Sequence, residues 1–245
     1  MQLQEILYSQ GFGTRRVCAG LIQQGLVAVQ PHGSANFVVL TEASEEVLAQ
    51  GLQLCVQGVV WPYKAKAYIL MNKPAGTECS QKPSTYPSVY TLLPSPLRLR
   101  PSKSAVDGVQ TVGRLDQDTT GMLLLSDDGQ FLHRMSSPKK HVPKIYQVRT
   151  KHAVDAVQIA RLIEGVVLDD DPKAVRAAHC DQTGSHSLDL TLTEGKYHQV
   201  KRMLAAVGNR VEALHRSQIG LLSLPADLMP GQWRWLSEEQ LGLLR

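Results

Sequence analysis

The spacing of apolar positions predicts a short, mixed unit at the start of the chain. Apolar residues recur at helical spacing over residues 3–9 and 15–23, and Thr14 stands where a helix N-cap is expected. Apolar runs typical of short strands follow at 26–29, 37–40 and 52–56. We therefore expect a small module over residues 1–60, joined at Trp61-Pro62 to a second domain over residues 61–245.

The second domain is predicted to contain more strands than helices. Strand-like patterns occupy 67–71, 144–150, 174–178 and 188–193, and helical spacing occurs at 154–163 and 197–207. Gly208 stands where a C′ glycine would end the last helix. The Pro/Ser-rich, basic stretch 94–110 is expected to be a long exposed loop. Because strands and helices do not alternate regularly, the sequence predicts an α+β fold.

Composition and charge narrow the class of protein. The chain has 245 residues, of which 43% are hydrophobic and 20% charged, as in folded globular proteins. A net charge of +4 favours an anionic partner. No apolar run is long enough for a membrane helix and no signal peptide is visible, so we expect a cytoplasmic protein. The four cysteines form no CxxC pair, which predicts free thiols.

Candidate chemistry is concentrated in residues 112–129, VGRLDQDTTGMLLLSDDG. A calcium loop starting at Asp116 would place the apolar run Met122–Leu125 at ligand positions, which disfavours it. A phosphatase motif of Asp116 and Asp118 should follow a buried parallel strand, but Gly113-Arg114 precede it. Two alternatives remain open from the residues alone: a structural turn capped by Asp and Thr, and a catalytic carboxylate that needs no metal.

Two basic segments suggest contacts with nucleic acid. Residues 136–152 interleave Lys139, Lys140 and Lys144 with Tyr146, a pattern suited to phosphate contacts and base stacking, or to a solvated charged face. The helix at 197–207 carries basic residues at its start, namely Lys196, Lys201 and Arg202. Such a residue beside a catalytic carboxylate would keep it ionised, although these are also ordinary surface residues. We expect His198 and His215 to be structural, and no two histidines have zinc-site spacing.

Taken together, four ordered motifs resemble those of the RsuA-type rRNA pseudouridine synthases. They are GRLDQDTTG, KIYQV, EGKYHQVKRMLAAVGN and VEALHRSQIG, and MNKPAG at 71–76 matches the family's first strand and turn. The resemblance spans residues 66–236, and the first sixty residues are similar to the family's small αL-type RNA-binding module. It implies that this module precedes a catalytic domain with a mixed, largely antiparallel sheet, flanked by helices around a central cleft.

The resemblance also implies roles for individual residues. Asp116 matches the family's essential aspartate, Tyr146 the tyrosine that packs on uracil, and Lys201 the basic partner of the aspartate. Contacts with the substrate or RNA are expected at Arg114, Thr119, Thr120, Lys139, Lys140, Lys144, Arg202, Arg15 and Arg16, with further phosphate contacts at Arg98, Arg100 and Lys103. The module opens with Gln2-Leu3-Gln4-Glu5 instead of the usual Arg-Leu-Asp-Lys, so two basic contacts are missing.

The expected activity is the isomerisation of a uridine to pseudouridine in ribosomal RNA, with small-subunit (16S) rRNA as the target. Large-subunit (23S) rRNA is the alternative target, and a non-catalytic RNA-binding or ribosome-assembly protein is the alternative class. The reaction requires neither a redox step nor a group donor, so we expect no cofactor and no metal. The expected partner is ribosomal RNA or an assembly intermediate, and the protein is expected to act as a monomer away from membranes.

Overall fold

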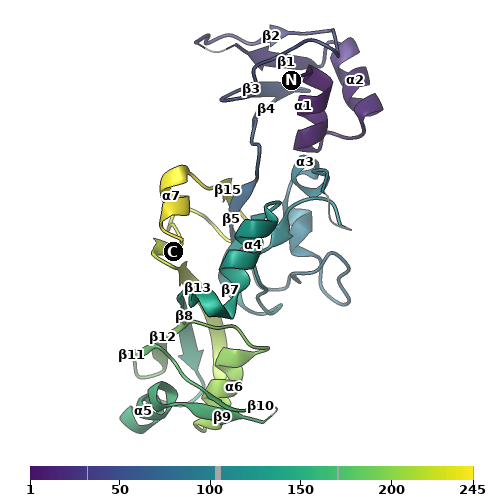
Figure 1. The fold of residues 1–245 in the computed structure, drawn as a ribbon. Helices are drawn as coiled ribbons and strands as arrows, with labels where there is room; N and C mark the ends of the chain where they lie inside the picture. Colours follow the sequence, from purple (N-terminus) through teal and green to yellow (C-terminus); the bar gives the residue numbers. More distant parts are fainter. Residues whose placement is uncertain (32, 103–105, 170, 245) are drawn as a thin grey trace. The chain divides into compact units, whose positions relative to one another are not determined.

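A computed structural model describes residues 1–31, 33–102, 106–169 and 171–244, which form two compact units (Figure 1). The first unit combines Met1–Ala67 with Leu93–Gln110, and the second combines Tyr68–Leu92 with Thr111–Arg245. Lys103, one of the expected phosphate contacts, lies outside the described residues. The division of the chain into a module and a catalytic domain is retained as a proposal, and each unit is described by itself.

The first unit contains a helical pair and a small antiparallel sheet with the strand order β2-β1-β3-β4. Its elements are α1 (Leu3–Gln10), α2 (Arg15–Gln23), β1 (Val27–Gln30), β2 (Val38–Val39), β3 (Gln53–Val56), β4 (Val59–Pro62) and α3 (Ser95–Arg98). The Thr14 side chain accepts a hydrogen bond from the Val17 amide, which confirms the predicted N-cap. Trp61-Pro62, expected at the join, instead belong to β4, and Trp61 packs edge-on against Phe12.

The stretch 94–110 is not the exposed loop expected from its composition. It contains α3, and both Leu97 and Val109 are fully buried. Arg100 is only 2% exposed, and its guanidinium donates to Gln10 Oε1 at 3.0 Å and to the Lys64 carbonyl at 2.7 Å. The expectation that Arg100 contacts phosphate is therefore wrong, because its charge is used to satisfy buried oxygens within the first unit.

The second unit is built on one large sheet with smaller pieces around it. Its strands are β5 (Tyr68–Lys73), β7 (Thr120–Ser126), β8 (Lys144–Thr150), β9 (Val166–Leu168), β10 (Asp171–Val175), β11 (His179–Gly184), β12 (Ser187–Leu192), β13 (Val211–Ile219), β14 (Leu222–Ser223) and β15 (Trp233–Trp235). Its α-helices are α4 (Gly129–Ser136), α5 (Ala156–Glu164), α6 (Gln199–Ala206) and α7 (Glu238–Gly242). The short 3₁₀ turns are η1 (Val89–Leu92) and η2 (Pro138–Lys140), and β6 (Gln110–Thr111) spans the boundary between the units.

The large sheet has the order β11-β12-β8-β13-β7-β5-β15. Along this order β13 and β7 pair in parallel, and the other neighbours pair antiparallel. Strands were predicted at 144–150, from its alternating pattern, and at 188–193, and the structure has them as the neighbours β8 and β12. This mixed, largely antiparallel sheet with helices confirms the predicted α+β class.

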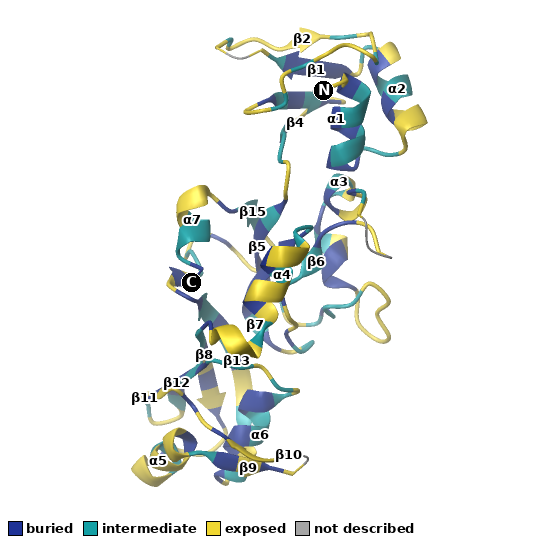
Figure 2. Ribbon diagram, viewed as in Figure 1, coloured by how far each residue is buried: buried dark blue, intermediate teal, exposed yellow. Residues whose placement is uncertain are grey.

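The core of the second unit lies where β5 and β7 are covered by α4 (Figure 2). After Thr120, every residue of β7 is buried, because both faces of this strand are covered. Phe131 and Met135 of α4 pack into the same cluster as Leu70, Met122 and Leu124. The loop that precedes β7 is therefore anchored to the buried core of the unit.

Helix α6 confirms the predicted amphipathic pattern but begins later than expected. Val200, Met203 and Leu204 are buried, and Gly208 has a positive φ of 80°, as a C′ glycine requires. His198 has a φ of 49°, so the helix begins at Gln199 and not at residue 197. Across the described ranges, none of the helices has the length and hydropathy that a bilayer crossing requires.

Candidate active site

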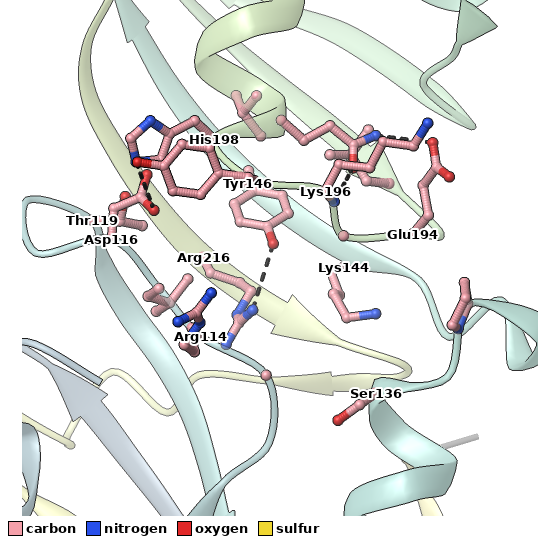
Figure 3. A pocket seen from close by; sticks show the side chains of 18 of the residues that line it. Arg114, Asp116, Thr119, Ser136, Lys144, Tyr146, Glu194, Lys196, His198 and Arg216 are labelled. Carbon is pink, nitrogen blue, oxygen red and sulfur yellow. Dashed lines mark hydrogen bonds and ion pairs between the residues drawn. The ribbon is translucent and has the colours of Figure 1, made fainter. Parts of the chain in front are cut away.

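A pocket of about 310 Å³ opens on the second unit, between the loop before β7 and the turn before α6 (Figure 3). Its lining includes Arg114 and Asp116 from the loop, Lys144 and Tyr146 from β8, and Arg216 from β13. The turn between β12 and α6 contributes Glu194, Lys196 and His198, and the first turn of α6 contributes Lys201. Segments far apart in the sequence thus bring carboxylates, cations and an aromatic ring into one pocket.

Asp116 is held on a tight loop that enters β7. The Thr119 amide donates to the Asp116 carbonyl at 3.1 Å, and Thr120 begins the strand. The Asp116 side chain is 25% exposed, so the carboxylate is partly shielded from water but open to the pocket. Because the loop is short and leads directly into the buried strand β7, it restricts the positions that the Asp116 carboxylate can take.

The Lys73 side chain holds this loop in place through hydrogen bonds to backbone carbonyls. Lys73 was not among the predicted site residues. Lys73 is fully buried, and its ammonium donates to the carbonyls of Thr119 at 2.9 Å, Pro74 at 3.1 Å and Gln117 at 3.3 Å. Burial lowers the pKa of Lys73, and the nearby negative charges of Asp118 and Asp116 act in the opposite direction. Lys73 thus positions the backbone on either side of Asp118.

Replacing Lys73 with Met is expected to loosen this loop. The substitution removes the three hydrogen bonds of the ammonium, so we expect the free energy of unfolding to fall by about 1–3 kcal/mol. The Thr119 carbonyl loses its donor, whereas the Gln117 and Pro74 carbonyls still accept from the Gly76 amide and the Thr77 hydroxyl. Displacement of Asp116 should also slow a single enzyme turnover by about tenfold or more. Urea unfolding and single-turnover kinetics test both effects, with the exposed Lys82→Met as the matched control. A Lys73→Met protein as stable and active as the control would contradict the positioning role.

Lys201 lies between two carboxylates of the loop. Its ammonium is 3.0 Å from Asp116 Oδ2 and 2.6 Å from Asp118 Oδ1. Burial disfavours the charged amine, but the hydrogen bonds to Asp118 and Asp116 prevail and raise the pKa of Lys201. For Asp118, burial disfavours the carboxylate, yet the bond from Lys201 holds its pKa below the usual value. Asp118 therefore helps to hold the cationic partner of Asp116 in place.

His198 lies next to Asp116, a position that was not predicted from the sequence. Its Nε2 lies 3.4 Å from Asp116 Oδ1, and its ring stacks on the exposed Tyr197 with 3.8 Å between centroids. The sequence favours a structural, hydrogen-bonded role for His198, and the structure shows in addition that its ring lines the pocket beside the carboxylate. The family motif EGKYHQVKRML contains His198 and could have indicated a role in the site. The left-handed backbone conformation at His198, which turns the ring toward Asp116, depends on the tertiary fold.

Tyr146 lies across the pocket from the loop, on the central strand β8. It is 9% exposed, and its hydroxyl accepts a hydrogen bond from Arg216 Nη1 at 3.5 Å. The register pairs Tyr146 with Arg216 of β13 and with Leu190 of β12. Tyr146 is thus flanked in the sheet by residues of both neighbouring strands, and it lines the pocket.

The residues expected to contact substrate or RNA are placed in different surroundings. Arg114 and Lys144 line the pocket, whereas Lys139 and Lys140 are exposed on η2. Thr119 also lines the pocket but is only 1% exposed. The remaining residues are bound to protein groups: Thr120 Oγ1 contacts His215 Nδ1 at 2.9 Å and Arg202 donates to the Tyr197 carbonyl at 3.2 Å.

Arg15 and Arg16, the expected contacts in the first unit, are both exposed at the start of α2. Arg15 is already paired with Glu5 at 2.6 Å and lies over the Tyr8 ring at 4.0 Å. Glu5 is one of the residues that depart from the usual module pattern. Part of the positive charge at this helix is therefore neutralised inside the module.

The structure also tests the calcium-loop and phosphatase interpretations of the loop that contains Asp116. No cluster of three or more His, Cys, Asp and Glu side chains suited to a metal ion occurs among the described residues. Asp116 and Asp118 would be ligands in a calcium loop, and nucleophile and acid in a phosphatase. In the structure they share the Lys201 ammonium. This arrangement fits a carboxylate paired with a cationic side chain.

Comparisons with known proteins agree with this geometry. The family model described as RNA pseudouridylate synthase matches residues 67–206. The Bacillus subtilis (strain 168) protein named Uncharacterized RNA pseudouridine synthase YtzG is 37% identical, covering 100% of this chain and 98% of its own. Ribosomal small subunit pseudouridine synthase A of Pasteurella multocida (strain Pm70) is 34% identical, covering 98% of each chain.

A solved structure extends the likeness to the fold. The crystal structure described as a pseudouridylate synthase covers 100% of both chains, with a TM-score of 0.67 and 31% sequence identity. Together with the family model and the relatives of nearly equal length, it confirms the resemblance seen in the motifs. The chain belongs to the RNA pseudouridylate synthase family and is a pseudouridine synthase, an isomerase.

Proposed function

We propose that this enzyme converts a specific uridine of small-subunit (16S) rRNA to pseudouridine. The observation that carries the proposal is the Asp116–Lys201 ion pair facing Tyr146 within one pocket. The choice of RNA rests on the relatives named as small-subunit enzymes, one of which matches this chain almost end to end. The substrate is 16S rRNA itself or an assembly intermediate that contains it.

In the proposed reaction, Asp116 is the catalytic carboxylate. The bond between uracil N1 and ribose C1′ breaks, the base turns in the pocket, and a bond forms between C5 and C1′. One proton leaves C5 and one is gained at N1, so the reaction needs no redox partner or group donor, and no cofactor. Lys201 is the cationic partner of Asp116, with its ammonium 3.0 Å from Asp116 Oδ2.

Tyr146 is proposed to bind the base and to assist proton removal from C5. A base stacked on an aromatic ring gains about 1–3 kcal/mol. Bringing the target uridine out of its RNA stack costs a few kcal/mol. Phosphate contacts would offset that cost, and we assign them to Arg114, Lys144 and the exposed pair Lys139 and Lys140.

Other basic residues are proposed to support binding of the RNA. Arg202 and the loop threonines Thr119 and Thr120 are assigned to shaping the RNA-binding side of the pocket. Arg16, with Arg15 held by Glu5, is the contact proposed for the first unit. We further propose that the enzyme works in the cytoplasm as a monomer, away from membranes.

The target is tested by mapping pseudouridine in 16S and 23S rRNA from cells that lack this protein. We expect one 16S site to lose its modification, and the wild-type gene to restore it. A gene encoding Asp116→Asn should not restore the site, although the protein accumulates normally. Loss of a 23S site with an unchanged 16S profile would overturn the small-subunit assignment, and an unchanged profile in both RNAs would overturn the rRNA assignment.

A further inference from the structure

A buried arginine at the pocket has no role in the proposals above. Arg216 of β13 lines the pocket and is only 3% exposed (Figure 3). It is the cation nearest to the Tyr146 hydroxyl in that view, and it lies away from the Asp116–His198 contact. A guanidinium stays charged at all accessible pH values, so this is a fixed positive charge in a largely dry part of the site.

One of the three guanidinium nitrogens of Arg216, Nη2, makes no hydrogen bond. Nε donates to the Met122 carbonyl at 2.8 Å, and Nη1 donates to the Tyr146 hydroxyl at 3.5 Å. Nη2 is buried and has no hydrogen-bond partner. Among the described residues no carboxylate forms an ion pair with Arg216, although buried arginines usually have such a partner. A buried donor without an acceptor is unfavourable, unless a ligand supplies the acceptor.

The strand pairing fixes where this guanidinium can lie. Arg216 is opposite Tyr146 on β8 and opposite Gly121 on β7. Gly121 has a φ of 101°, and a Cβ atom there would lie 2.4 Å from the Arg216 carbonyl oxygen, so only glycine allows this approach. The arginine is therefore held on three adjacent strands and is not a mobile surface side chain.

A second cation shares this part of the pocket. Lys144 lines the pocket on β8, and its ammonium donates to the Val142 carbonyl at 2.9 Å. Burial, together with the smaller effect of the positive charge of Arg216, lowers the pKa of Lys144 to about 8. The pair of Asp116 and Lys201 thus shares the pocket with the cations Arg114, Lys144, Lys196 and Arg216 and with Glu194, whose Oε1 accepts from Gln199.

We propose that Arg216 Nη2 donates a hydrogen bond to a carbonyl oxygen of the target uracil. The inference rests on the proposed function, and it makes Arg216 a residue that contacts the reacting base. When the N1–C1′ bond breaks, its electron pair stays with the ring, and the negative charge spreads over N1, O2 and O4. A fixed guanidinium beside one of these oxygens stabilises that charge, and the shielded pocket strengthens the interaction. Once C5 has bonded to C1′, the C5 proton is lost and N1 gains a proton.

The contact is tested with Arg216→Gln and Arg216→Lys, and with Arg234→Gln as the matched control. Arg234 is paired with Asp227 and lies outside the pocket lining. The substrate is whichever rRNA the wild-type enzyme modifies, 16S or 23S, so a wrong choice of rRNA leaves this comparison intact. We expect Arg216→Gln to slow a single turnover at saturating RNA by about 100-fold, with RNA affinity within about threefold of wild type. Arg216→Lys should recover part of the rate, and the control should match the wild type.

Substrate analogues separate a base contact from a structural effect. Sulfur is a weaker acceptor than oxygen, so RNA with 2-thiouridine or 4-thiouridine at the target weakens a bond to O2 or O4. We expect one of the two analogues to slow the wild type, and to slow the folded Arg216→Lys protein to a different extent. The same analogue should be turned over by Arg216→Gln no more slowly than uridine is. Equal effects of both analogues on every variant would overturn the contact. A loss of RNA affinity with an unchanged rate at saturation would reassign Arg216 to a phosphate.

Discussion

An enzyme with Asp116 replaced by Asn is expected to bind its RNA normally and to form almost no pseudouridine. Asn has nearly the same shape as Asp but carries no negative charge, so the loop and the pocket should keep their form. We expect the single-turnover rate to fall by about 10³-fold or more, the range for loss of a group that acts directly in the chemistry. RNA affinity is measured in parallel and should change by less than about threefold.

The folded structure should tolerate this change. Lys201 keeps its 2.6 Å bond to Asp118, and the Lys73 clamp on the loop carbonyls does not involve the Asp116 side chain. Asp227→Asn, which alters an exposed ion pair with Arg234, serves as the matched control. An Asp116→Asn enzyme that retained more than about a tenth of the wild-type rate would remove Asp116 from the proposed chemistry.

The second large effect is expected for Tyr146→Phe. The change keeps the aromatic ring on β8 and removes the hydroxyl that accepts from Arg216. Stacking of the base should therefore persist, while proton removal from C5 should slow by about 100-fold. Single-turnover kinetics and RNA affinity measure the two effects separately. Tyr146→Ala, which also removes the ring, should weaken binding by the stacking contribution of about 1–3 kcal/mol.

An isotope measurement identifies the step that Tyr146→Phe affects. If the C5 proton leaves slowly in this variant, deuterium at C5 of the target uridine should slow product formation further. In the wild type, where other steps limit the rate, the same substitution should have a smaller effect. A Tyr146→Phe enzyme with the wild-type rate and no added isotope effect would argue against a role in proton transfer and leave Tyr146 as a stacking residue.

Local patterns were sufficient where the structure depends on neighbours in the sequence. The alternation in 144–150 predicted β8 with its observed bounds, and the helical spacing after Tyr197 predicted the buried face of α6. The N-cap at Thr14 and the C′ glycine at 208 were also correct, because capping involves residues only a few positions apart. The helix α4 and the long strand β13 were not predicted from their patterns.

Pattern and composition failed where a polar residue is satisfied by distant groups. The stretch 94–110 is basic and rich in Pro and Ser, which favours a loop, yet Arg100 is buried against Gln10 and the Lys64 carbonyl. Lys73 is a further case, since nothing in its neighbourhood indicates that its ammonium would bind three backbone carbonyls. A buried lysine or arginine cannot be distinguished from an exposed one in the sequence when its hydrogen-bond partners lie far away along the chain.

Ordered motifs and local periodicity were enough to identify the family, the α+β class and Asp116, Tyr146 and Lys201 as candidate site residues. The way in which these residues meet depends on the folded structure. It placed Lys201 between Asp116 and Asp118, turned His198 toward Asp116, and buried Arg216 against Tyr146 with one donor unused. The physical reason is that strand register and burial set the distances between remote side chains, and neither quantity is a property of any one segment.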